Sequence, residues 1–176
     1  MVWLQDLNLP TPRANLPEQY GEPDYSIKEA HLTRFNAQGQ RLQTLKSTQI
    51  THYPEKDLTL FENPLIHHYS LQGQVWQITA KRAEQFSNND IYLEEKVVIT
   101  PLNPDSDYLP EFLTERLWVD SESNLAHTQD PVSFISPTGK TTGEGFQLHL
   151  GTGLAEILQT VQGNYLPLQA TQDSKL

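Results

Sequence analysis

The chain has 176 residues, no cysteine, and 12 basic against 22 acidic side chains, which gives a formal charge of −10. This length suits one domain. The absence of cysteine excludes a disulfide scaffold, thiolate metal sites and a cysteine nucleophile. The acidic balance disfavours nucleic acid as a partner, because binding a row of phosphates needs clustered cations. The hydrophobic fraction of 36 % is low for a globular protein, and it lies in runs far shorter than the ~20 apolar residues of a membrane span.

The N-terminal stretch is rich in proline, with Pro10, Pro12, Pro17 and Pro23. Proline fixes φ and removes a backbone donor, so residues 1–23 are predicted to form an extended linker. Trp3 is typical of a bilayer interface and equally fits an ordinary disordered N-terminus. The polar residues 169–176 are predicted to be a disordered tail, which leaves residues 24–168 as the folded domain.

Most of the folded domain shows a period of two, in which apolar and polar residues alternate. The apolar positions of the clearest runs are Trp76, Ile78, Ala80, Ile91, Leu93, Val97, Ile99, Phe146, Leu148 and Leu150. Such alternation places one face of a strand on a core and the other in water. No helix of three turns is indicated, so the chain is predicted to be all-β.

Turn signals divide these runs at regular intervals. Asn, Asp, Gly and Pro concentrate at residues 36–39, 54–57, 87–90, 120–124, 137–139 and 151–153. Several short strands with such spacing indicate a sandwich, a jelly roll or a stacked β-solenoid. Residues 101–110 contain three prolines and are predicted to form a long surface loop.

An internal repeat adds detail to this architecture. Residues 45–67 align without a gap on residues 78–100 at an offset of 33, and a third copy follows at an offset of 35. A shorter fourth copy falls within residues 146–165. Each copy reads as strand, polar turn and strand, and a unit this small cannot bury its own apolar face. We therefore expect stacked hairpins in a long, twisted, two-walled sheet with open edges at its ends.

The sequence contains no recognisable motif for catalysis, for a metal or for a cofactor. His67 and His68 are neighbours on a predicted strand, so their side chains point to opposite faces and cannot share a metal. Asp120 and Glu122 fall in a turn, where carboxylates cap backbone donors. We therefore expect a non-enzymatic protein without a cofactor or a metal site.

The apolar face of the sheet has two interpretations. It can be an ordinary packed core, or it can line a slot between two walls that do not fully close. Such a slot would accept acyl chains, because burying one methylene group is worth ~0.8 kcal/mol. A site of this kind needs shape and apolarity rather than special residues, so it leaves no sharp motif.

Several segments, taken in order, resemble a known family of periplasmic proteins. They are residues 75–83, 89–93, 96–99, 113–114, 117–120, 126–132 and 143–146. Their order and spacing, together with the repeat, are similar to those of the LptC family of lipopolysaccharide export proteins, and of OstA-like domains more broadly. The resemblance covers about residues 25–166.

This resemblance implies a single twisted antiparallel β-jellyroll with an open, V-shaped apolar groove and no catalysis. It implies that lipopolysaccharide arrives from an inner-membrane ATP-binding cassette transporter, rests in the groove by its lipid A acyl chains, and passes on to LptA. It also implies a periplasmic location and one N-terminal membrane anchor, which we expect to precede Val2 in the natural protein. Nucleic acid is not expected as a partner, and the open edges would also allow an edge-to-edge homodimer.

The residues expected to contact lipid come from two sources. The resemblance implies Phe61 for the groove and Ala30 for its N-terminal mouth. Alternation and the repeat add Leu58, Leu60, Ile78, Ile91, Leu93, Val97, Phe134, Phe146 and Leu148.

Partners are expected to add strands to the exposed sheet edges. The resemblance implies that the transporter meets the N-terminal edge, at Tyr25 and Ile27. It implies that LptA meets the C-terminal edge, at Leu154, Ile157, Val161 and Tyr165. Close strand approach near that edge is expected to depend on Gly143 and Gly145.

Two alternatives stand beside a membrane-anchored lipid bridge. One is a soluble, LptA-like bridge component. The other is a jellyroll that binds carbohydrate through exposed aromatic platforms at Trp3, Trp76 and Trp118. Trp76 is in phase with Ile78, which favours an interior position and argues against a sugar platform.

Overall fold

A computed structural model describes residues 20–102 and 110–165 of the chain. Most of the predicted linker, all of the predicted tail and the middle of the predicted loop at 101–110 lie outside the described residues. Within these ranges the strands are β1 (Tyr25–Phe35), β2 (Arg41–Tyr53), β3 (Leu58–Glu62), β4 (Leu65–Tyr69), β5 (Val75–Thr79), β6 (Arg82–Gln85), β7 (Ile91–Leu102), β8 (Glu111–Asp120), β9 (Leu125–Ser136), β10 (Gly139–His149) and β11 (Leu154–Tyr165).

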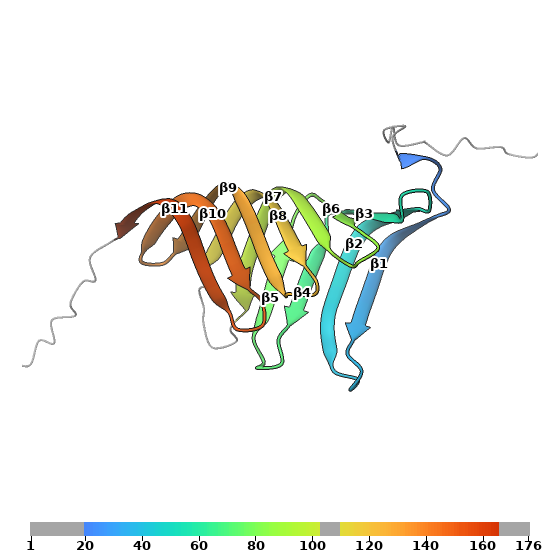
Figure 1. The fold of residues 1–176 in the computed structure, drawn as a ribbon, viewed down its shortest axis with the longest axis horizontal. Coiled ribbons are helices and arrows are strands. Elements are labelled where there is room, and N and C mark those ends of the chain that lie inside the picture. The colour runs from blue at the N-terminus through green and yellow to red at the C-terminus, as the bar shows by residue number, and fades with distance from the viewer. Residues whose placement is uncertain (1–19, 103–109, 166–176) are drawn as a thin grey trace, which may run out of the picture.

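All eleven strands belong to one antiparallel sheet. β2 pairs with both β3 and β4, and β7 pairs with both β5 and β6, so each of these short pairs forms the two halves of one bent strand. When β3 with β4, and β5 with β6, are each counted as one strand, the topology is a plain meander in which every strand lies beside its neighbours in sequence. Figure 1 shows β1 and β11 at opposite ends of the long axis. The predicted all-β, antiparallel architecture is confirmed, and all six predicted turns fall at breaks between strands.

A line of interruptions crosses the whole sheet, and we call it the fold line. It runs through residues with positive φ in the middle of strands or between half-strands: Glu29, Asn63, Glu95, Lys96 and Thr160. The register shifts between Glu94 and Val97 in β7, and between Thr142 and Glu144 in β10. Such bulges bend a strand and increase its twist. Because the bends are in register from one strand to the next, the two halves of the sheet face each other.

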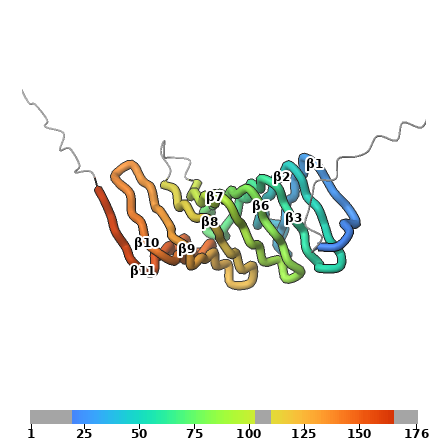
Figure 2. Tube along the Cα trace, turned by 90° about the horizontal axis from the view of Figure 1, so that it is seen from above, coloured from blue at the N-terminus to red at the C-terminus, as the bar shows by residue number. Residues whose placement is uncertain are grey.

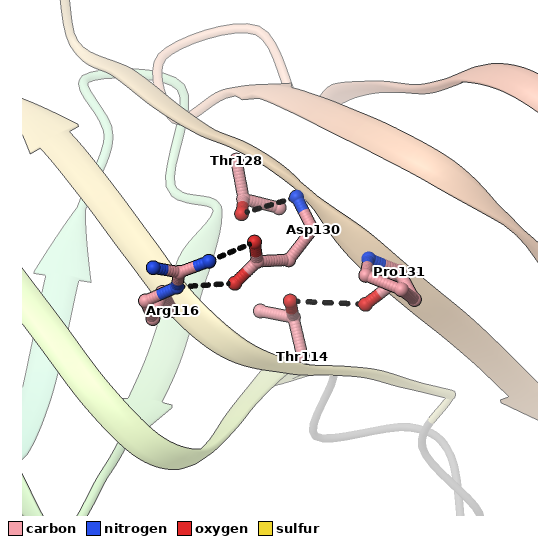
Figure 3. A network of polar contacts seen from close by, with 5 residues as sticks. All are labelled: Thr114, Arg116, Thr128, Asp130 and Pro131. Carbon is pink, nitrogen blue, oxygen red and sulfur yellow. Dashed lines mark hydrogen bonds and ion pairs between the residues drawn. The ribbon is translucent and has the colours of Figure 1, made fainter.

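Side chains replace ladder hydrogen bonds where the fold line crosses β8 and β9 (Figure 3). The Thr114 hydroxyl donates to the carbonyl oxygen of Pro131 at 3.1 Å, and the backbone N–H of Asp130 donates to Oγ1 of Thr128 at 3.1 Å. Arg116 donates to both carboxylate oxygens of Asp130, at 2.7 and 2.6 Å, which lowers the pKa of Asp130. Backbone groups left free by the bend are thus satisfied locally.

The two halves of the sheet form a first and a second wall. The first wall contains residues 49–53, 58–62, 82–85, 91–94, 116–120, 125–128, 146–149 and 154–157. The second wall contains residues 41–47, 65–69, 75–79, 97–102, 111–114, 131–136, 139–143 and 161–165. Figure 2, seen from above, shows the strands crossing the long axis obliquely, as a twisted sheet requires.

The core lies between the walls. The register aligns Ile50, Phe61, Ala83, Leu93 and Leu117 across the first wall, and Leu45, Ile66, Ile78, Ile99 and Phe112 across the second. Every one of these side chains is at most 9 % exposed. Rings from opposite walls meet where Phe112 packs on Phe146, with centroids 4.7 Å apart. Burial of each large apolar side chain stabilises the fold by about 1.5–3 kcal/mol, so the two walls hold each other closed in the middle.

Gly143 lies at a close approach of β10 and β11. A Cβ added to Gly143 would lie 2.4 Å from Cγ2 of Ile157 and 2.7 Å from the carbonyl oxygen of Gln159. Nearby Gly145 has a φ of +72°, which side chains rarely adopt. Both glycines therefore fit the expectation that strand approach near this edge depends on them.

Replacing Gly143 by alanine should destabilise the fold by about 1–3 kcal/mol, because the new methyl group overlaps the backbone and side chain of β11. Gly151→Ala is the matched control, since its Cβ would meet only the His149 ring, at 3.2 Å. The control should change stability by about 0.5 kcal/mol or less. Urea unfolding of the two variants measures the difference, and equal losses would contradict the close approach.

Candidate functional site

Most residues predicted to contact lipid point into the space between the walls. Phe61, Ile78, Leu93, Val97, Phe146 and Leu148 are each at most 1 % exposed, Ile91 is 4 % and Ala30 is 6 % exposed, and Phe134 is partly buried against them. In this structure they pack against one another. The interior is thus one continuous apolar layer that is closed in its middle, and an acyl chain could enter only by separating the walls.

The expected interior position of Leu58 and Leu60 is corrected by the structure. Phe61 belongs to the core cluster, and adjacent residues of a strand point to opposite faces, so Leu60 lies on the outer face of the first wall. It pairs with Thr51 and lines an outer depression beside Tyr20. Leu58 has the same phase as Leu60 and also lies beside Tyr20; it is buried, at 4 % exposed, but does not belong to the core cluster. The repeat alignment predicted the strand correctly but assigned the wrong face.

Both end strands expose apolar side chains. On β1, Tyr25 and Ile27 are 45 % and 46 % exposed, and on β11, Leu154, Val161 and Tyr165 are 57–64 % exposed. Ile157, in contrast, packs partly against the core. In the described part of the chain, β1 pairs with β2 alone and β11 with β10 alone, so each carries a row of backbone groups without a strand partner. Such edges are templates for strand addition.

The two walls meet at the fold line like the arms of a V. The open side of this V, opposite the fold line, contains a crevice. Its larger part is a cavity of about 210 Å³ with an apolar floor that includes Leu45 and Ile91. A smaller part of about 20 Å³ continues from it toward Leu150. Both parts are lined by Gln43 of the second wall and by Arg34, its partner on β1. We call this feature the rim crevice.

A partly buried histidine and a buried tryptophan lie beside the rim crevice. His68 lines its smaller part, and the pKa of His68 is lowered, first by burial and then by the positive charge of Arg34. Trp76 pairs with His68 across β4 and β5 and is 4 % exposed, and its indole N–H has no acceptor among the residues that the structure describes. A buried donor without a partner is uncommon and needs a structural explanation.

The two tryptophans in the described ranges, Trp76 and Trp118, do not form the common platform that carbohydrate binding would require. Trp76 lies in the interior, as its phase with Ile78 predicts. Trp118 is 41 % exposed on the outer face of the first wall, where it stacks on Phe86 with ring centroids 5.6 Å apart. Trp3 lies outside the described residues.

In the described ranges, no group of three or more His, Asp or Glu side chains is arranged to hold a metal ion. Nor does that part of the chain contain a helix of the length and apolarity that a membrane crossing requires. The geometry offers apolar surface, open edges and a polar rim.

Acidification should weaken the fold partly through His68. Because its pKa is lowered on folding, the unfolded chain binds this proton more readily, so stability is lost as pH falls below the ordinary value of 6.5. Between about pH 7.5 and about pH 5, wild type should lose more unfolding free energy than His68→Gln. Urea titrations at both pH values test this, with His31→Gln, exposed on β1, as control. An equal loss in wild type and His68→Gln would contradict the assignment.

Comparison with known proteins agrees with this geometry. A curated relative, the lipopolysaccharide export system protein LptC of Haemophilus influenzae (strain ATCC 51907 / DSM 11121 / KW20 / Rd), is 24 % identical over 184 residues, which cover 94 % of this chain and 88 % of the relative. A solved structure with a similar fold is LptH of Pseudomonas aeruginosa, the LptA homologous periplasmic component of the conserved lipopolysaccharide transport device. Its TM-score is 0.54 at 7 % identity, over 71 % of this chain and 95 % of LptH.

The likeness to LptH concerns the fold alone and identifies the sheet as a β-jellyroll. The family model described as "Lipopolysaccharide-assembly, LptC-related" matches residues 1–166, nearly the whole chain. The chain belongs to the LptC-related family of lipopolysaccharide-assembly proteins.

Proposed function

We propose that this protein is a non-catalytic part of the periplasmic bridge that carries lipopolysaccharide from the inner to the outer membrane. In this proposal it receives lipopolysaccharide from the inner-membrane ATP-binding cassette transporter and passes it to LptA. The observation that carries the proposal is the continuous apolar layer between two walls of one sheet, which ends in exposed edges on β1 and β11.

Acyl chains compete with the packing between the walls. Separation of the walls exposes side chains such as Phe61 and Ile78, and an acyl chain between them covers the same surface again. Each buried methylene group contributes ~0.8 kcal/mol, so several chains together can offset the lost contacts between the walls. The sugars, which have no apolar surface of this extent, remain in water. The protein itself supplies no energy, so ATP hydrolysis in the transporter must drive transfer.

The exposed edges support the assignment of partners. An added strand gains backbone hydrogen bonds along β1 or β11 and extends the apolar interior into the next protein. We assign the transporter to β1, at Tyr25 and Ile27, and LptA to β11, at Leu154, Val161 and Tyr165. The proposed setting is the periplasm, with the chain anchored to the inner membrane by an N-terminal span. A homodimer through the same edges is the competing assembly.

Photo-crosslinking tests the groove directly. A photoreactive residue in place of Phe61 or Ile78 should give lipopolysaccharide adducts in cells, because both side chains lie between the walls. The same residue in place of Lys81 or Glu94, which are not part of the core, should give few. Adducts confined to these outer positions would exclude a groove between the walls.

Binding of the transporter at β1 and binding of LptA at β11 should be lost independently of each other. A chain that ends at Leu154 lacks β11 and should no longer capture LptA in a pull-down, while it still binds the transporter. Ile27→Asp should do the reverse, since it places a charge on the β1 edge, where Ile27 is 46 % exposed. Circular dichroism checks that both variants fold. Loss of both partners, or of neither, would contradict the edge assignment.

A further inference from the structure

The larger part of the rim crevice has an unusual charge for this protein. Its lining contains Arg34 and no Asp or Glu, although the chain as a whole carries a formal charge of −10. In the described part of the chain, Arg34 forms no ion pair. The guanidinium therefore keeps its full capacity to bind an anion.

Neutral donors surround Arg34. The side chains of Gln43, Gln85 and Asn89 line the same cavity, and each carries an amide NH₂ group. Amide donors together with a guanidinium suit the oxygens of a phosphate group. The one carboxylate of the rim crevice, Asp120, lies in the smaller part, where its Oδ1 accepts from the backbone N–H groups of Glu122 and Ser123.

The floor of the rim crevice leads into the apolar interior. Leu45 and Ile91 form part of this floor and belong to the core cluster. In a ligand whose anionic group binds Arg34, the atoms attached to that group would therefore lie where the apolar layer between the walls begins. The arrangement of one cation, neutral donors and an apolar floor matches an amphiphile with an anionic head.

A second, independent observation that points to a ligand is the indole N–H of Trp76, which is buried and has no acceptor in the described part of the chain. Its cross-strand partner His68 lines the crevice, and a Cβ added to Gly153 would lie 3.7 Å from Cζ2 of Trp76. Cζ2 is bonded to the carbon that carries Nε1, so the indole N–H lies within two bonds of an atom beside the turn between β10 and β11. An ester or amide carbonyl at the junction of head and acyl chain would supply the missing acceptor.

We propose that the rim crevice binds the phosphate group of a phosphorylated acyl lipid, with Arg34 as the principal contact and the acyl chains between the walls. This inference rests on the proposed lipid-carrying function and names the part of the ligand that the open side of the V selects. It assigns Arg34 a role in specificity, while the apolar layer supplies most of the affinity.

Binding of three probes to the purified chain tests the proposal. The probes are bisphosphorylated lipid A, the same lipid after removal of its phosphates, and inorganic phosphate. Wild type should bind the phosphorylated lipid about tenfold more tightly than the dephosphorylated one, as one charge-assisted contact predicts. Arg34→Gln should reduce this preference to about onefold and leave the affinity for the dephosphorylated lipid unchanged.

Lys46→Gln is the matched control. Lys46 is exposed, pairs with His31 on the same β1–β2 hairpin and does not line the crevice. Its substitution therefore removes one positive charge, as Arg34→Gln does, away from the proposed site. Thermal unfolding checks that both variants fold. An equal loss in the two variants would mean general electrostatic attraction and would overturn the site. Inorganic phosphate that binds as tightly as the lipid would overturn the assignment to a lipid head.

The outcome also separates this inference from the proposed function. If wild type binds both lipids equally well, the phosphate site is wrong and the groove stands. If folded wild type binds neither lipid, the lipid-carrying function fails and the phosphate site fails with it.

Discussion

The fold line is the constraint on which the rest of this structure depends. A single meander with one apolar face cannot bury that face unless it bends onto itself. Positive φ at Asn63, Glu95 and Thr160 marks the bend at three places, and register shifts continue it in neighbouring strands. Backbone contacts persist across the line, as in the 2.9 Å bond from the N–H of Lys81 to the carbonyl oxygen of Glu95. The position of the fold line therefore determines which residues form the core between the walls, which line the rim crevice, and how the open edges are divided between the walls.

Alternation in the sequence predicts the fold class, the turns and most of the interior, because an antiparallel strand with one wet face shows its phase directly. Bends are harder to predict, since a bulge shifts the phase by one residue. This explains why Leu58 and Leu60 were assigned to the wrong face, while Phe61 was placed correctly. The Asn63-Pro64 dipeptide is a turn signal that could have revealed one bend. No local signal marks Glu95 and Lys96. The rim crevice unites residues far apart in the chain, so only the folded structure reveals it.

The distribution of charge gives the acidic composition a structural meaning. The charged groups of the outer surface are partly neutralised by local pairs such as Arg116 with Asp130 and Arg82 with Glu94. Exposed pairs of this kind add little to stability. Arg34, in contrast, stands without a carboxylate on the open side of the V. An arginine without a carboxylate beside it, in a chain of net negative charge, favours selectivity for an anion at the rim crevice over strength of binding.

The meander topology also governs how the molecule comes apart. When β3 with β4, and β5 with β6, are each counted as one bent strand, every strand is hydrogen-bonded only to its neighbours in sequence, as in repeat proteins whose stability is a sum over neighbouring units. Opening can therefore begin at β1 or β11, where few side chains are buried, without disturbing the centre. Amide protection should therefore rise from both ends of the sheet toward β7. The end strands are thus the segments that exchange neighbours at the smallest energetic cost.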